Sequence, residues 1–350
     1  MKTLDSISWN VPEPEYRQDK ALSYSNLSHY ESGGRFDSMS SYGERIESPS
    51  LTFGSAVDAI ITEGEDAFNE RFMVVDNDLD QEVASVVKAI YNEYSEFYKR
   101  FSQIPIDCVS LVAKQNGFWP ADKWSDQARY NGLIKRGNIE EFWQILKQSE
   151  NKTVISLSTY SKVCACVNAL QNSDATKYFF GINDDDIERH YQLKFKATLN
   201  GIDYRCMFDC LIVDHKNKTI RPVDLKTSHK KEWNFAKSFI DFNYSIQARL
   251  YSRILRDNIL RDEYFKDFTI LPYFFIVVNN DTMDPVPLVW EYPDNFAEGE
   301  LVYGKNRNII CRDPETIGKE LYMYLNEVHI VPIGININDS NNLLDKLMTL

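Results

Sequence analysis

Two aspartates and a lysine lie close together on a predicted β-hairpin. Asp209 belongs to one β-rich run, and Asp224 and Lys226 belong to the next, with a turn signal at residues 215–218 between the runs. Alternation along a strand puts Asp224 and Lys226 on one face. A turn at 215–218 sets Asp209 opposite Asp224, with Cβ atoms roughly 4.5–5.5 Å apart. Facing carboxylates repel each other unless a cation lies between them, so the spacing predicts a divalent cation beside a lysine.

Such a set of residues is suited to phosphodiester hydrolysis. Mg²⁺ uses one or two carboxylates, keeps several waters and completes its shell with phosphate oxygens, and Mn²⁺ is a substitute to test. The metal polarises the phosphoryl oxygen and lowers the pKa of a bound water, while a lysine orients that water or stabilises developing negative charge. The alternative is a surface hairpin whose Asp and Lys side chains form solvated ion pairs. The short pattern alone leaves both interpretations open.

The N-terminal half of the chain, residues 1–180, is predicted to be mainly helical. Apolar residues recur at helical spacing in four segments. These segments are 51–72, with Ser50 as its N-cap, then 81–101, 139–148 and 159–171. They predict a helical layer.

Residues 185–335 have a different sequence pattern, which predicts short strands, a long helix and another strand. The runs form a predicted β-meander with turns at 200–201 and 215–218. A helix over 233–259 and a buried strand over 271–280 follow. This order predicts an α/β or α+β core within one domain of 350 residues.

Amino-acid composition and net charge argue against several classes of protein. The chain is 43% hydrophobic, and its net charge is 39 minus 52, or −13, which argues against a broad basic surface but leaves room for a local basic groove. The six cysteines show neither a CxxC pair nor zinc-ligand spacing. With no run of about 18 apolar residues and no apolar leader, we expect an ordered cytoplasmic protein without a membrane segment.

Several segments around the hairpin, taken in order, resemble motifs of one enzyme superfamily. Residues 222–227, PVDLKT, look like a PxDxKT signature with Asp in place of Glu, and Asp209 stands at the usual metal-binding position. Residues 244–251, YSIQARLY, are similar to a YdxQaxxY helix, and residues 54–61, GSAVDAII, resemble a GtaxHaxxxE segment. Over roughly residues 50 to 290, the chain resembles the PD-(D/E)xK nucleases, in particular the lambda-exonuclease and RecE-like phage exonuclease group.

The resemblance implies a restriction-endonuclease-like core, a mixed central sheet flanked by helices, and a Mg²⁺-dependent DNA exonuclease. The catalytic residues that it implies are Asp209, Asp224, Lys226 and Gln247. The metal ligands would be Asp209, Asp224, Asp58 and Glu188, with Gln192 as a rival to Glu188. Asp58 stands where the family usually carries His, which puts metal preference or rate in question. Its alternative interpretation is a solvated residue at the edge of the helix's apolar face.

Contacts to nucleic acid are predicted on the helix that carries Gln247. Gln247 and Tyr251 lie four residues apart, and therefore on one helical face. Arg249 and Arg253 belong to a basic stripe that could contact phosphates, and Lys230 follows the catalytic strand. A solvated charged face is the alternative for these basic residues. Residues 118–137, which combine aromatic and basic side chains, are a further candidate for the substrate channel.

As the resemblance implies it, the function is the processing of DNA duplex ends in phage recombination or replication, in the host cytoplasm. A single-strand annealing protein is a candidate partner, and a homo-oligomer is left open. An endonuclease or nickase on the same fold is one alternative, since fold does not dictate where the cut falls. A non-catalytic nucleic-acid-binding or assembly protein is the other.

Overall fold

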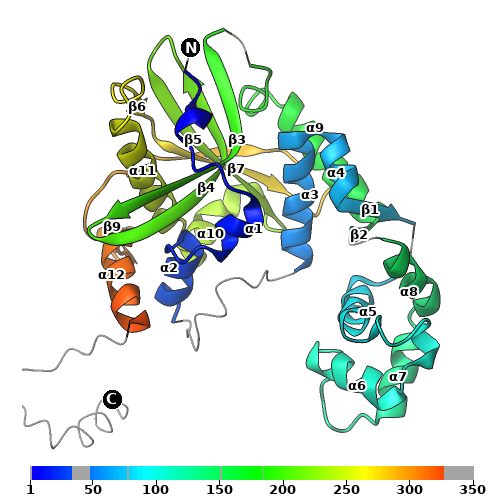
Figure 1. The fold of residues 1–350 in the computed structure, drawn as a ribbon. Coiled ribbons are helices and arrows are strands. Elements are labelled where there is room, and N and C mark those ends of the chain that lie inside the picture. The colour runs from blue at the N-terminus through cyan, green and yellow to red at the C-terminus, as the bar shows by residue number, and fades with distance from the viewer. Residues whose placement is uncertain (1, 34–47, 77–78, 150–151, 184, 327–350) are drawn as a thin grey trace, which may run out of the picture.

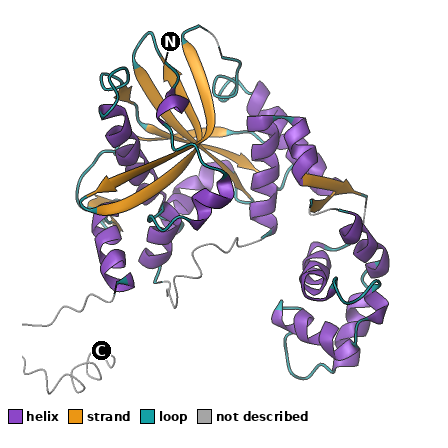
Figure 2. Cartoon of the chain, in the orientation of Figure 1, coloured by secondary structure: helices purple, strands orange, loops and turns teal. Residues whose placement is uncertain are grey.

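A mixed β-sheet with helices on both faces forms the centre of the molecule (Figures 1 and 2). The structure is a computed structural model that describes residues 2–33, 48–76, 79–149, 152–183 and 185–326. The strands of this sheet are β3 (Ile187–Leu199), β4 (Ile202–Asp214), β5 (Thr219–Ser228), β6 (Thr269–Ile270), β7 (Tyr273–Asn279) and β8 (Leu288–Tyr292). Their order is β3-β4-β5-β7-β8, with β6 also paired to β5. The predicted mixed α/β core is confirmed.

The meander β3-β4-β5 is antiparallel, whereas β5 pairs with β7 in parallel. Asn200 and Gly201 join β3 to β4 with φ angles of 50° and 79°, which is the left-handed backbone that a two-residue type I′ hairpin turn requires. The parallel pair needs a crossover connection. Here η4 (Glu232–Asn234), α10 (Phe235–Asp241) and α11 (Tyr244–Leu260) provide it.

Helices cover each face of the sheet with a separate hydrophobic cluster. One cluster joins β4 to α11, α2 (Tyr24–Glu31) and α12 (Pro314–Leu325). The other joins the sheet to α3 (Pro49–Glu63) and α9 (Leu157–Asn172). The sheet therefore positions side chains that come from both ends of the chain.

A group of helices with its own core lies apart from the sheet, beyond α4 (Glu65–Arg71) and the strands β1 (Phe72–Val75) and β2 (Thr153–Ser156) (Figure 1). We call it the helical lobe, and it contains α5 (Gln81–Tyr94), η3 (Phe101–Gln103), α6 (Ile106–Gln115), α7 (Asp126–Ile134) and α8 (Ile139–Gln148). Trp143, which is fully buried, lies in this core. The short parallel strands β1 and β2 connect the lobe to the rest of the chain.

The remaining elements are short. They are η1 (Leu4–Ile7), α1 (Glu13–Gln18), β9 (Leu301–Tyr303) and β10 (Ile309–Cys311). None of the helices in the described ranges combines the length and apolar character that crossing a membrane requires.

Two predicted helices are broken where the backbone leaves the helical region. The helix predicted over 51–72 is divided at Gly64, whose φ of 92° ends α3, and its N-cap is Ser48 rather than Ser50. The helix predicted over 233–259 is divided at Asn243, whose φ of 55° separates α10 from α11. By contrast, α8 spans Ile139–Gln148, as the periodicity predicts.

Candidate active site

The β4–β5 hairpin has the predicted register. The ladder ends at the pair Cys210 and Val223, so Asp209 and Asp224 are the next two residues in line. Beyond this pair the strands separate, and the Asp209 carboxylate accepts a hydrogen bond from the Leu225 backbone N–H at 2.9 Å. The side chain of Asp209 therefore reaches across to the strand that carries Asp224.

A kink in the sheet explains why the ladder is interrupted here. Gln192 on β3 has a φ of 54°, and its pairing with Asp209 is missing although the neighbouring pairs on both sides are formed. Along β4, Phe208 packs into the cluster on one face of the sheet and Cys210 into the cluster on the other. Residues two apart on a regular strand lie on the same face, so β4 changes the face that it presents to each cluster at Asp209. The side chain of Asp209 belongs to neither hydrophobic cluster.

Asp224 is held between a lysine and an amide. The Lys226 Nζ lies 2.6 Å from Asp224 Oδ2, and the Gln247 Nε2 on α11 donates a hydrogen bond to Asp224 Oδ1. Asp224 is 2% exposed. The packing of α11 on the sheet thus brings Gln247 to the hairpin, as the resemblance implies.

The neighbours of Lys226 favour its protonated form. Burial alone would lower its pKa, but the neighbouring Asp224, Tyr244 and Asp209 raise the pKa above the ordinary value for lysine. The ammonium also lies over the Tyr244 ring, 4.5 Å from its centre. Lys226 can therefore stabilise negative charge, but it is not suited to take up a proton as a general base.

Asp58 on α3 completes a cluster of carboxylates. Its Oδ2 accepts a hydrogen bond from Gln192 Nε2 at 2.9 Å. Burial, with repulsion from Glu63 and Asp224, raises the pKa of Asp58 to about 7 despite the opposing effects of Arg71 and Gln192. The pKa of Asp209 is also raised, first by burial and then by Asp224 and Asp58. Carboxylates with pKa values raised in this way are common where a site concentrates negative charge.

Close packing of α3 against β5 brings Asp58 to the sheet. A Cβ added at Gly54 would lie 3.2 Å from the Thr227 Oγ1 on β5. We expect Gly54→Val to push α3 outward, to lower the free energy of unfolding by about 1–3 kcal/mol and to weaken any activity that needs Asp58. Chemical denaturation measures the loss in the free energy of unfolding. Thr227→Ala in the same chain should recover part of the loss, and no recovery would show that the helix is not held at this contact.

The donor chemistry of the cluster fits a hard divalent cation. Within the described ranges, no three His, Cys, Asp or Glu side chains are arranged so that they could hold a metal ion. Mg²⁺ needs fewer protein ligands, since one or two carboxylates suffice when water and phosphate oxygens complete the shell. Asp209 and Asp224 provide two carboxylates, and the buried Oε1 of Gln247 has no hydrogen-bond partner.

Glu188 lies elsewhere, which corrects its prediction as a metal ligand. It pairs with Val213, near the far end of the ladder, four residues and therefore roughly 13 Å along the strand from Gln192. Its Oε2 lies 3.0 Å from the Nε2 of His190 and 3.2 Å from that of His215. The rival candidate, Gln192, is the one that the fold brings to Asp58.

Arg249 and Arg253 are buried, which corrects the prediction that they contact phosphates. Arg249 is 0% and Arg253 7% exposed, and both donate hydrogen bonds to Asp313 Oδ1, at 2.9 and 2.7 Å. Asp313 also caps α12 by accepting from the backbone N–H groups of Glu315 and Thr316. These arginines therefore attach α12 to α11 and are not available to DNA.

Tyr251 is also buried, at 8% exposed, and its ring packs at an edge-to-face angle against Phe208. This burial corrects its prediction as a direct DNA contact. Lys230 remains at the surface, where its Nζ lies 3.3 Å from Asp241. Its contact with nucleic acid stays a prediction.

Two aromatic residues lie beside Lys226: Tyr244, which begins the predicted motif at 244–251, and Tyr24, which sequence reasoning did not place at the site. Tyr244 lies directly under the Lys226 ammonium. Tyr24 on α2 lies 6.3 Å from Tyr244, ring centre to ring centre. Burial raises the pKa of Tyr24, and the charge of Lys226 opposes this rise. Tyr24 has no sequence signal, because only the docking of α2 against α11 brings it here.

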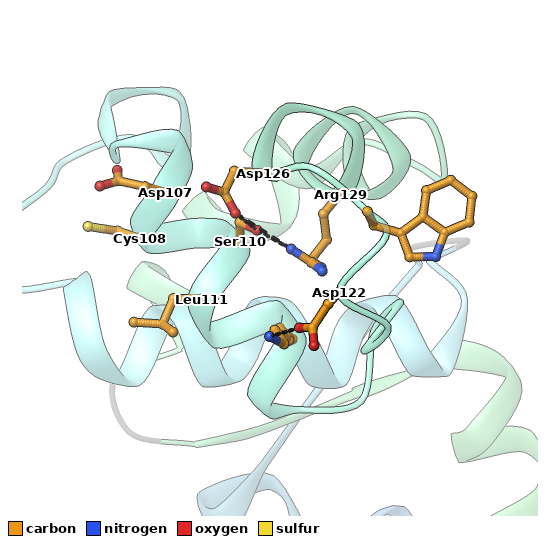
Figure 3. A pocket seen from close by; sticks show the side chains of 9 residues that line it. Asp107, Cys108, Ser110, Leu111, Asp122, Asp126 and Arg129 are labelled. Atoms are coloured by element: carbon orange, nitrogen blue, oxygen red, sulfur yellow. Dashed lines mark hydrogen bonds and ion pairs between the residues drawn. The ribbon is translucent and has the colours of Figure 1, made fainter.

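The segment 118–137 lies in the helical lobe, around a separate pocket. Figure 3 shows this pocket between α6 and α7, with Asp122, Asp126 and Arg129 on its walls. Its lining contains none of the candidate catalytic residues. Arg129 is 3% exposed and donates to Ser110 Oγ at 2.6 Å and to the Trp119 carbonyl at 3.1 Å, so it stabilises the turn between these helices.

Comparisons with known proteins add a distant likeness to a solved structure. Neither a protein-family model nor a curated protein sequence matches the chain. Among solved structures, one from Eubacterium rectale, named "Putative exonuclease", is similar over 97% of this chain and 98% of that chain, with 13% identity and a TM-score of 0.39. A likeness this distant carries no argument about activity, which must come from the site itself.

Proposed function

We propose that this chain is a Mg²⁺-dependent deoxyribonuclease that hydrolyses phosphodiester bonds at DNA ends. The observation that supports it best is the convergence of Asp209, Asp224, Lys226 and Gln247 at one kink of the sheet. Solvated surface pairs would leave these groups exposed, whereas Asp224 is 2% exposed. Buried carboxylates near one another are costly unless they are paired or bind a cation.

Each residue has a distinct role in this proposal. Asp209 and Asp224 would hold the metal, which polarises the phosphoryl group and supplies an activated water when bound. The Lys226 ammonium, held over Tyr244, stabilises the negative charge that develops on the phosphoryl oxygens. Gln247 fixes the orientation of the Asp224 carboxylate through its amide hydrogen bond.

A digestion assay tests this function against its alternatives. The full-length protein is incubated with end-labelled linear duplex, single strands and covalently closed circles, each in Mg²⁺, Mn²⁺ or EDTA. Metal-dependent loss of linear DNA alone is the expected result. Cleavage of closed circles would indicate an endonuclease or nickase. Binding of DNA without cleavage of any substrate would contradict the enzyme and favour a binding or assembly protein.

A further inference from the structure

An exposed aromatic ring, that of Phe242, packs against Tyr244, which itself contacts Lys226. Phe242, at the turn between α10 and α11, is 52% exposed. Its ring centre lies 5.7 Å from that of Tyr244, with 32° between the ring planes. Tyr244 in turn lies under the Lys226 ammonium. Phe242 is therefore the solvent-facing end of an aromatic row that starts at the candidate active site.

The turn that carries Phe242 is held in place by polar contacts from α2. The Phe242 carbonyl accepts hydrogen bonds from the Tyr24 hydroxyl and from the Ser28 Oγ, the latter at 3.2 Å. Asn243, in the left-handed conformation, donates from its Nδ2 to the Oγ atoms of Ser28 and Ser32, at 3.3 and 3.2 Å. The ring is thus positioned without being buried, so a flat ligand would bind it at little ordering cost.

Cations accompany the exposed rings in residues 230–242, the segment that leads from β5 to α11. The Lys230 Nζ lies 6.0 Å from the centre of the Phe242 ring. Lys231 lies in the same way over Trp233, at 5.7 Å, and Trp233 is 63% exposed. Exposed aromatic faces interleaved with lysines suit a chain of flat bases joined by phosphates, because every base offers a π-face and every phosphate a negative charge.

We propose that Phe242 is a stacking platform for an unpaired base of the strand whose phosphate lies at Lys226, with Lys230 facing the backbone of that strand. This inference rests on the proposed function and specifies its substrate. Within a duplex, both faces of an internal base are covered by its neighbours, so the ring can stack only on an unpaired or terminal base. The site would therefore take a frayed or single-stranded end.

The test is stacking itself, measured in EDTA so that the strand is not cut. Single-stranded oligonucleotides carry 2-aminopurine at one of the last four positions of either end, and its fluorescence falls when the base stacks on a ring. We expect wild type to quench at least one position. Phe242→Ala should lose this quenching and bind roughly 5- to 100-fold more weakly, whereas Phe242→Trp should retain both properties.

Phe97→Ala is the matched control, since Phe97 is 75% exposed in the helical lobe, and it should bind as wild type does. If Phe242→Ala quenches and binds as wild type does, the platform is wrong, although hydrolysis by wild type would leave the proposed function intact. Equal loss in Phe242→Trp and Phe242→Ala would also overturn it. Failure of wild type both to bind and to cleave DNA would overturn the function and the platform together.

Discussion

Replacement of Lys226 by alanine is expected to lower the rate of phosphodiester hydrolysis by roughly 10²–10³-fold, the usual cost of removing one preorganised charge-stabilising group. The ammonium lies 2.6 Å from Asp224 and over the Tyr244 ring, and its raised pKa keeps it charged. Single-turnover rates on a linear duplex measure this change, because they separate chemistry from binding.

Lys237→Ala is the matched control for this experiment. Lys237 also contacts an aspartate, Asp241, but its side chain is 71% exposed on α10, and its replacement should leave the rate unchanged. Circular dichroism shows whether each variant is folded. A folded Lys226→Ala protein that cleaves at the wild-type rate would place the chemistry somewhere other than the hairpin.

The second large effect is on stability. Replacement of Asp313 by alanine is expected to lower the free energy of unfolding by about 3–5 kcal/mol, because it leaves the buried Arg249 guanidinium without its carboxylate partner, whereas Arg253 keeps Glu315 at 2.7 Å. Arg249, which is 0% exposed, and Arg253 both donate to Asp313 Oδ1. The same change removes the N-cap of α12. Urea unfolding of wild type and variant measures the difference.

The pH dependence of this stabilisation has a definite sign. Burial would raise the pKa of Asp313, but hydrogen bonding and attraction from Arg253, with Arg249, lower it overall. A lowered folded-state pKa gives stability that is present above the unfolded value, near 3.9, and that is lost as the pH falls through the folded value. The variant should therefore differ most from wild type at neutral pH and least in strong acid.

Asp241→Ala is the control for Asp313→Ala, since Asp241 pairs with two lysines at the surface. It should change stability little, because solvent screens exposed ion pairs. Equal unfolding midpoints for Asp313→Ala and wild type would contradict the structural role of the two arginines.

The hairpin was predictable because local rules fix it. The turn residues between Asp214 and Thr219 set the register, and alternation then places Asp224 and Lys226 on one face. The kink at Gln192 and Asp209 was not predictable, since nothing in the residue types of β3 indicates a positive φ there. This kink decides that Gln192, and not Glu188, reaches Asp58.

The arginine stripe shows where periodicity fails. Spacing along α11 correctly places Arg249 and Arg253 near one another, but it does not reveal what lies opposite. A segment about sixty residues later supplies Asp313, and this partner makes their burial possible. The place of Tyr24 beside Tyr244 was not predicted for a related reason, because Tyr24 reaches it from α2 only through tertiary packing.

The dependence of hydrolysis on Mg²⁺ concentration, measured for wild type and for Asp209→Asn, tests the central claim most directly. Asparagine keeps the size of the side chain and removes its charge. We expect wild-type release of end label to rise with Mg²⁺ and to saturate, and the variant to fall by more than about 10²-fold at every concentration, since a bound metal contributes several kcal/mol. Wild-type rates and Mg²⁺ dependence in a folded Asp209→Asn protein would contradict the account.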